Sequence, residues 1–168
     1  MEPRIDDAQV EARVLAAAAA LGVAYQVVWI DPSLAATADF CAAYGYEPSQ
    51  SGNCIVVASR TQPPVHCACV VRATRQLDVN RRVRKLLGVR RASFASPETT
   101  VELTGMQPDG VTPLALPTDM PLYVDAGLLE AEQVVIGGGS RRLKLVVPSE
   151  ALTTLRGAEV IPDLVRES

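Results

Sequence analysis

Aromatic side chains make up only 4% of this 168-residue sequence, although 48% of its residues are hydrophobic. Small aliphatic side chains must therefore build the core, and this composition excludes a disordered chain. No apolar run approaches the roughly 20 residues that a transmembrane helix needs. The alanine-rich stretch 14–20 follows an acidic segment, which is the wrong flank for a signal peptide. We therefore expect one cytoplasmic domain that spans residues 1–168.

Metal-binding side chains are also few, with one histidine and four cysteines. The stretch 66–69, His-Cys-Ala-Cys, suggests a metal site, but successive strand residues point to opposite faces. Cys67 and Cys69 could share a face while His66 points away, and zinc requires four converging ligands. We interpret these cysteines as small apolar strand residues, kept reduced in the cytoplasm, and expect no metal.

Basic residues are scarce outside one short segment. Residues 1–71 hold three Lys or Arg against seven Asp or Glu, and residues 92–168 hold five against eleven. The segment 72–91 holds half of the 16 basic residues and a single acid, Asp78. Such a patch is typical of a surface that binds a polyanion, although a solvated helix face is the alternative reading.

Start and stop signals predict helices and strands that alternate irregularly along the chain. Helices are expected at 6–20, 34–44, 79–87 and 97–104, with another from Pro148, and strands at 23–30, 54–59, 65–72, 121–125, 133–136, 142–147 and 158–161. The runs 54–59 and 65–72 lack polar alternation, which predicts central strands. Without a strict βαβ order, we predict an α+β fold with one mixed, curled, partly barrel-like sheet flanked by helices.

Two segments could carry chemistry. The proline-rich stretch 106–121 forms no regular element, and long loops in compact domains are commonly functional. At the start of the strand 54–59, Asn53 suits either a turn or a substrate contact. Cys54 would need a nearby base to act as a nucleophile, and it should face away from Asn53, so we interpret it as a packing residue.

The order of motifs resembles the YbaK/prolyl-tRNA-synthetase-associated family of aminoacyl-tRNA editing domains. The resemblance covers nearly the whole chain and rests on several segments in series. They are "ATADFCAAYGYEP" (36–48), a basic helix ending in Leu-Gly (79–88), "SPE…LTG" (96–105), a loop closing on Thr-Pro-Leu (112–114), "PLYVDAGLLEAEQVVIGGG" (121–139), and "PSEAL" followed by "GAEV" (148–160).

The resemblance implies hydrolysis of the ester that joins a wrong amino acid to the 3′-terminal adenosine of a tRNA. The substrate's own ribose hydroxyl would assist the attacking water, with no cofactor, metal or covalent enzyme intermediate. The aminoacylated acceptor end of tRNA would be the partner. Association with a synthetase, or a homodimer, is left open.

In this family, a lysine before the strand 54–59 faces the pocket, and a Gly-x-x-x-Pro loop surrounds the aminoacyl carbonyl. Here Asn53 stands at the lysine position and Asp109 at the first glycine. The resemblance assigns catalysis to Asn53, Gly110, Thr112 and Pro113; substrate binding to Asp109, Val111, Asp125, Gly137, Gly138 and Gly139; and tRNA binding to Arg72, Arg75, Arg81, Arg82 and Lys85.

Each of these assignments has an alternative. The loop 109–113 could be a tight surface turn rather than an oxyanion-binding segment, and Asp125 could simply cap the following helical turn. Asparagine retains hydrogen-bonding groups but loses the cation, so the chain could instead be a non-catalytic member that binds tRNA, a nucleotide or a protein. A thiol hydrolase that uses Cys54 is the third reading.

Overall fold

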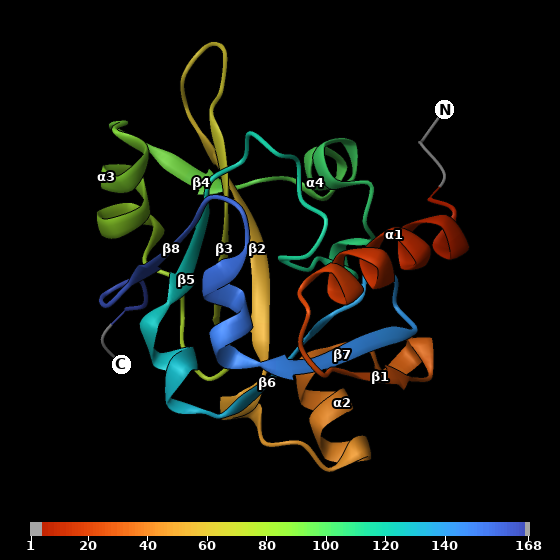
Figure 1. The fold of residues 1–168 in the computed structure, drawn as a ribbon. Coiled ribbons are helices and arrows are strands. Elements are labelled where there is room, and N and C mark those ends of the chain that lie inside the picture. The colour runs from red at the N-terminus through yellow and green to blue at the C-terminus, as the bar shows by residue number, and fades with distance from the viewer. Residues whose placement is uncertain (1–4, 167–168) are drawn as a thin grey trace.

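The strands of the protein form two sheets (Figure 1). The computed structural model describes residues 5–166. The larger sheet has the order β4 (Ala92–Phe94), β2 (Gly52–Ser59), β3 (His66–Arg72), β5 (Leu122–Asp125) and β8 (Ala158–Ile161). The smaller sheet has the order β1 (Gln26–Trp29), β7 (Leu143–Pro148) and β6 (Gln133–Gly137). The predicted α+β class is confirmed, with two sheets and no closed barrel among the described strands.

Helices of several kinds connect these strands. The α-helices are α1 (Asp7–Ala20), α2 (Thr37–Tyr44), α3 (Arg84–Leu87) and α4 (Pro97–Thr104). A π-helical turn, η3 (Val79–Val83), runs directly into α3. The 3-10 segments are η1 (Pro32–Leu34), η2 (Pro48–Gln50), η4 (Pro108–Gly110), η5 (Ala126–Glu130) and η6 (Ser149–Thr154). In the part of the chain that the structure describes, no helix has the length and apolarity to cross a membrane.

The capping signals of the sequence fix two helix starts. The side chain of Asp78 accepts a hydrogen bond from Arg81 N before η3, and Ser96 accepts one from Thr99 N before α4. These side chains satisfy backbone donors that have no partner inside the helix. The helix expected from Pro148 is a 3-10 segment instead, and the short edge strand β4 had no strong signal in the sequence.

Strands β2 and β3 lie inside the larger sheet, as their apolar runs predicted. They pair antiparallel, with Asn53 opposite Val71, while β3 pairs in parallel with β5. Alternate residues of these strands face two different hydrophobic clusters: Val56 and Val70 contribute to one, and Val57 to the other. Burial on both faces explains why neither strand shows a polar alternation.

Three hydrophobic clusters hold the layers together. The largest combines the facing sides of both sheets with Val14 of α1, and the second covers the other face of the larger sheet with η3. In the third, Phe40 of α2 packs with Val135 and Val146 on the outer side of the smaller sheet. This third cluster sets α2 beside the start of β2 and the end of β6, and these three elements frame the candidate site.

Candidate active site

A cavity of about 340 Å³ lies beside the start of β2. Segments from α2, β2, η4, β6 and β7 surround it. Its lining includes four of the predicted site residues: Asn53, Asp109, Val111 and Gly137. The structure therefore brings together one side chain from a strand, two residues of the proline-rich loop and the last residue of β6.

Asn53 is half-buried at the mouth of this cavity. Its Oδ1 accepts a hydrogen bond of 2.8 Å from Thr37 Oγ1, at the first residue of α2. This bond fixes the amide orientation, so the Nδ2 group keeps its two donor hydrogens for another acceptor. Thr37 also lines the cavity, and nothing in the sequence pattern had linked it to Asn53.

Two glycines allow the loop at η4 to pack directly on the end of β6. A Cβ atom on Gly110 would lie 2.5 Å from Ser140 O, and one on Gly137 would lie 2.7 Å from Val111 O. The Gly139 N–H donates to Gly110 O over 2.7 Å, which joins the two segments. Only residues without side chains permit this approach. Gly110 thus shapes the cavity wall, although it does not itself line the cavity.

The remaining predicted loop residues lie behind that wall. Thr112 is fully buried, and its Oγ1 accepts a hydrogen bond of 3.4 Å from Leu114 N. Pro113, Gly138 and Gly139 are also buried, and none of the four lines the cavity. Their contact with a substrate therefore remains a prediction.

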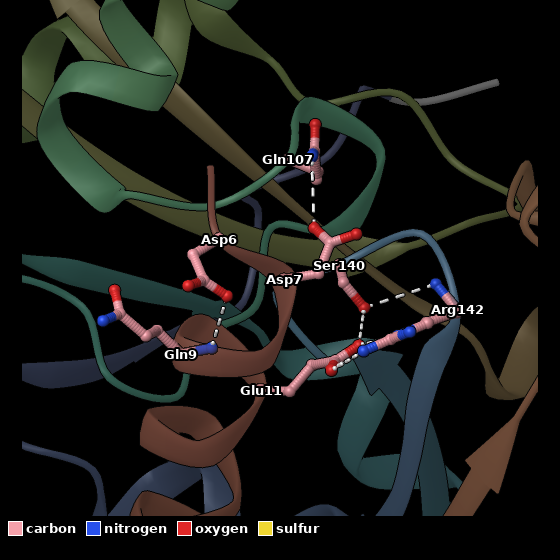
Figure 2. Close-up of polar contacts among 7 residues, drawn as sticks. All are labelled: Asp6, Asp7, Gln9, Glu11, Gln107, Ser140 and Arg142. Carbon is pink, nitrogen blue, oxygen red and sulfur yellow. Dashed lines mark hydrogen bonds and ion pairs between the residues drawn. The ribbon is translucent and has the colours of Figure 1, made fainter. Parts of the chain in front are cut away.

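A buried carboxylate on α1 anchors the wall from behind (Figure 2). Glu11 accepts hydrogen bonds from Ser140 Oγ at 2.6 Å and from Arg142 Nε and Nη2 at 2.7 Å each. The Arg142 guanidinium lowers the pKa of Glu11 despite its burial. Figure 2 also shows Gln107 Nε2, just before η4, donating to Asp7 Oδ1 over 3.2 Å. Helix α1 therefore holds both segments of the wall.

Asp125 is fully buried and forms a separate ion pair with the partly buried Arg72. Its carboxylate accepts hydrogen bonds from Arg72 Nε at 2.8 Å, from Arg72 N at 3.1 Å and from Gly127 N at 3.0 Å. It is the N-cap of η5, the structural role that the sequence allowed for it. Neither Asp125 nor Arg72 lines the cavity at Asn53, so their proposed contacts with substrate and tRNA stay predictions.

The structure gives Cys54 the packing role that the sequence favoured. Cys54 packs against the largest hydrophobic cluster, although it also lines the cavity beside Asn53 instead of facing fully away from it, and burial raises its pKa to about 12. A thiol of this kind is almost entirely protonated near neutral pH and makes a poor nucleophile. Cys67 and Cys69 do share a face of β3, with their sulfur atoms 4.0 Å apart. Within residues 5–166, no group of three or more Asp, Glu, His or Cys side chains is arranged to hold a metal ion.

Lys144 is a cavity residue that the sequence interpretation missed. It is the second residue of β7, only 8% exposed, and lines the same cavity as Asn53. Its Nζ lies 5.4 Å from the centroid of the Phe40 ring, and burial lowers its pKa. A single lysine within the apolar run 143–147, "LKLVV", was the available signal, because a buried strand tolerates a charge only for a reason.

A second cavity of about 760 Å³ adjoins the first, and Asn53 and Ile55 line both. Arg75, Arg81 and the exposed ring of Phe94 line it. Of the other predicted tRNA contacts, Arg82 forms an ion pair with Asp163, and both Arg82 and Lys85 line a third cavity. The basic segment is therefore divided between two neighbouring cavities.

The sequence model of the aminoacyl-tRNA editing domain matches residues 31–155. The chain belongs to this family. The matched range includes Asn53, the loop at η4 and Lys144, so the cavity lies wholly within the editing domain. The resemblance inferred from the motifs is thereby confirmed.

Solved structures agree with this assignment. The crystal structure of a candidate trans-editing enzyme for prolyl-tRNA synthetase superposes with a TM-score of 0.81 at 27% identity, covering 95% of this chain and 98% of that one. The structure of a hypothetical protein superposes with a TM-score of 0.79, also at 27% identity, covering 88% of this chain and 96% of the other. The editing-domain fold therefore accounts for nearly the entire chain.

Proposed function

We propose that this editing domain is a trans-acting aminoacyl-tRNA deacylase, which hydrolyses the ester of a mischarged tRNA. One observation carries the proposal: the cavity at Asn53 is formed by the segments that the family resemblance assigns to the substrate. Its volume of about 340 Å³ is at the lower end of the range for small-molecule sites, which suits an amino-acid ester better than a larger ligand.

In the proposed reaction, water adds to the ester carbonyl carbon and the bond to the ribose oxygen breaks. The departing ribose oxygen takes up the proton that the attacking water loses, and the neighbouring ribose hydroxyl helps to position the water. Asn53 Nδ2 donates a hydrogen bond to a substrate oxygen, while Asp109 and Val111 hold the acyl group through the backbone of the loop. Fixed dipoles of this kind stabilise developing negative charge without an ionised side chain.

The second cavity offers a path for the acceptor end of the tRNA. Arg75 and Arg81 would contact phosphates without reading the base sequence. The ring of Phe94 is 59% exposed, and an exposed aromatic ring is a stacking surface for an unpaired base. Because Asn53 and Ile55 line both cavities, a nucleotide chain in the second one can deliver its 3′ end to the first.

The test is release of amino acid from a panel of mischarged tRNAs, including tRNA-Pro that carries Ala, Cys or Ser. We expect release from at least one member, and a loss of about ten- to a hundredfold in kcat/KM for Asn53→Ala. Arg156→Ala is the matched control, since Arg156 is exposed and lines neither cavity. Failure to release any amino acid from any member would overturn the deacylase proposal.

The asparagine at the family's lysine position favours a second candidate, a non-catalytic domain that binds tRNA. Measurable tRNA binding without release of any amino acid would support it. Under that proposal Arg75→Ala would weaken the binding of tRNA. Asn53→Ala would leave the affinity for tRNA without an attached amino acid unchanged. A deacylase instead requires the first cavity to hold the acyl group while the second holds the nucleotide chain of the same charged tRNA.

A further inference from the structure

Lys144 is a buried cation for which the described residues supply no bonded acceptor. It is more than nine-tenths buried, yet no hydrogen bond or salt bridge within residues 5–166 reaches its Nζ. Asp109, the acid that lines the same cavity, is bound to Arg141 at 2.6 Å. A buried ammonium without a counter-charge costs free energy, and a ligand that supplies one removes that cost.

The start of α2 adds positive potential to the same cavity. Ala36 is the N-cap of this eight-residue helix and has no side chain that could accept a hydrogen bond from the first turn. Ala35, Ala36 and Thr37 all line the cavity; the Ala35 N–H donates to Pro32 O over 3.3 Å, so the free first-turn donor at this wall is the Thr37 N–H. Unpaired donors at a helix start favour a negative group. Lys144 and the start of α2 therefore point to the same kind of ligand.

The position of Lys144 identifies which part of a substrate it would meet. Lys144 lines the first cavity, whereas Arg75 lines the second, and Arg81 lines the second and the third. The Nζ of Lys144 lies next to the ring of Phe40 on α2. On the neighbouring strand β6, the residue paired with Lys144 is Gly137, which has no side chain to fill the space beside the lysine. With the nucleotide chain in the second cavity, the first one receives the acyl group and its side chain.

We propose that Lys144 selects the acyl group, so that the cavity prefers an aminoacyl ester whose side chain ends in a carboxylate. This inference rests on the proposed deacylase function. The ammonium would donate charge-assisted hydrogen bonds to the carboxylate, and the Thr37 N–H at the start of α2 would reinforce them. A neutral side chain of the same shape would leave the ammonium unpaired, which is how a polar site rejects such an analogue.

The experiment compares one tRNA charged with Asp, Asn or Ala. We expect the protein to release Asp about ten- to a hundredfold faster than the isosteric Asn, and Lys144→Met to abolish this ratio. Lys144→Arg keeps the charge and should retain part of the preference. Circular dichroism establishes that each variant is folded. Equal release of Asp and Asn by the wild-type protein would overturn the inference while leaving the deacylase function intact.

A binding arm separates the inference from the function on which it rests. Non-hydrolysable 3′-amides of adenosine that carry Asp or Asn are titrated calorimetrically, each with and without a 5′-phosphate. We expect tighter binding of the Asp amide, lost in Lys144→Met, even if no ester is hydrolysed. A loss of affinity that is the same for both amides and occurs only with the 5′-phosphate would mean that Lys144 binds phosphate, which overturns the proposal.

A spectroscopic readout tests the contact directly. Burial lowers the pKa of Lys144, and a bound carboxylate would raise it again. The neighbouring titratable groups are Cys41 on α2 and Asp109 at η4. An upward shift in the titration of the Lys144 side chain, followed by NMR, is expected with the Asp amide and not with the Asn amide. The same shift with both amides would contradict recognition of the side chain.

Discussion

Arg72 and Arg142 are each matched by a buried carboxylate, whereas Lys144 has no such partner within residues 5–166. Arg72 is bound to Asp125 and Arg142 to Glu11, and their side chains are 21% and 46% exposed. Lys144 is only 8% exposed and faces a cavity without such a partner. The most deeply buried cation is thus the one that the fold leaves unmatched. We infer that the two pairs serve the architecture, whereas the unmatched charge serves a ligand.

The two ion pairs act at different places. Asp125 and Arg72 join the ends of β5 and β3, beside the start of η5. Glu11 and Arg142 join α1 to the turn behind the cavity. Substitutions at the pairs should therefore reduce stability, while those at Lys144 should change ligand preference.

The largest effect is expected at Asp125. Asp125→Ala removes the acceptor of four hydrogen bonds in a fully buried position and leaves the Arg72 guanidinium without a partner. We expect the free energy of unfolding to fall by about 3–5 kcal/mol. Urea denaturation measures it, and Asp125→Asn should lose less because it still accepts from Gly127 N. A loss below about 1 kcal/mol would show that the pair is not architectural.

For Glu11→Gln we expect a smaller decrease in the free energy of unfolding, about 1–3 kcal/mol, measured by urea denaturation near neutral pH. The amide cannot accept both guanidinium hydrogen bonds and the bond from Ser140 as a carboxylate does. Glu150→Gln, on the exposed surface of η6, is the matched control and should change stability little.

The difference in the free energy of unfolding between the wild-type protein and Glu11→Gln should depend on pH if its origin is electrostatic. The pKa of Glu11 is lowered in the folded state from its ordinary value of 4.5. Its ionisation therefore contributes stability that is fully present above pH 4.5 and is lost as the pH falls through the folded value. The wild-type protein and Glu11→Gln should converge in stability in acid. A difference that stays constant across this range would assign the effect to packing alone.

Lys144→Met should change the free energy of unfolding in the opposite direction from the substitutions at the two ion pairs. Replacing an unmatched buried ammonium with a hydrocarbon of similar length is expected to leave stability unchanged or raise it by about 1 kcal/mol at pH 7. Since the folded state lowers the pKa of Lys144 from 10.5, the unfolded chain holds the proton more tightly. The wild-type protein should therefore gain stability as the pH rises toward 10.5, and the variant should not.

Urea denaturation at pH 7 and pH 9.5 measures both parts of this prediction. The advantage of Lys144→Met should be larger at pH 7 than at pH 9.5. A variant that is less stable than the wild-type protein by about 2 kcal/mol or more would mean that Lys144 has a structural partner, and the contrast with the ion pairs would fail.

Most of the fold was predictable because its signals are local. The apolar runs identified β2 and β3 as inner strands, and Asp78 and Ser96 marked the helix starts. Loop chemistry also identified the wall at Asp109 to Val111, through the motif resemblance. The division into two sheets was not predictable in this way, because sheet membership depends on which distant strands pair.

The cavity was only half predictable for a similar reason. Asn53 stood at a position that the family resemblance marked, whereas Lys144 comes from a strand 91 residues later and carried no motif. The family motif marks position 53 alone, so it contains no signal for a cation that another strand supplies to the same cavity. Likewise, Glu11 and Arg142 meet across most of the chain, and no periodicity could pair them.

The smallest stability effect is expected for Arg82, whose ion pair with Asp163 is largely exposed. The two side chains are 32% and 69% exposed, and their 2.9 Å contact lacks hydrogen-bond geometry. Arg82→Ala should change the free energy of unfolding by less than about 0.5 kcal/mol. If Arg82 binds a tRNA phosphate, the variant should nevertheless weaken tRNA binding and reduce its salt dependence, measured by filter binding across a salt series. Unchanged tRNA affinity together with a large loss of stability would instead give Arg82 a structural role like that of Arg72 and Arg142. The reason is that a charge is available to a partner only when the fold does not need it.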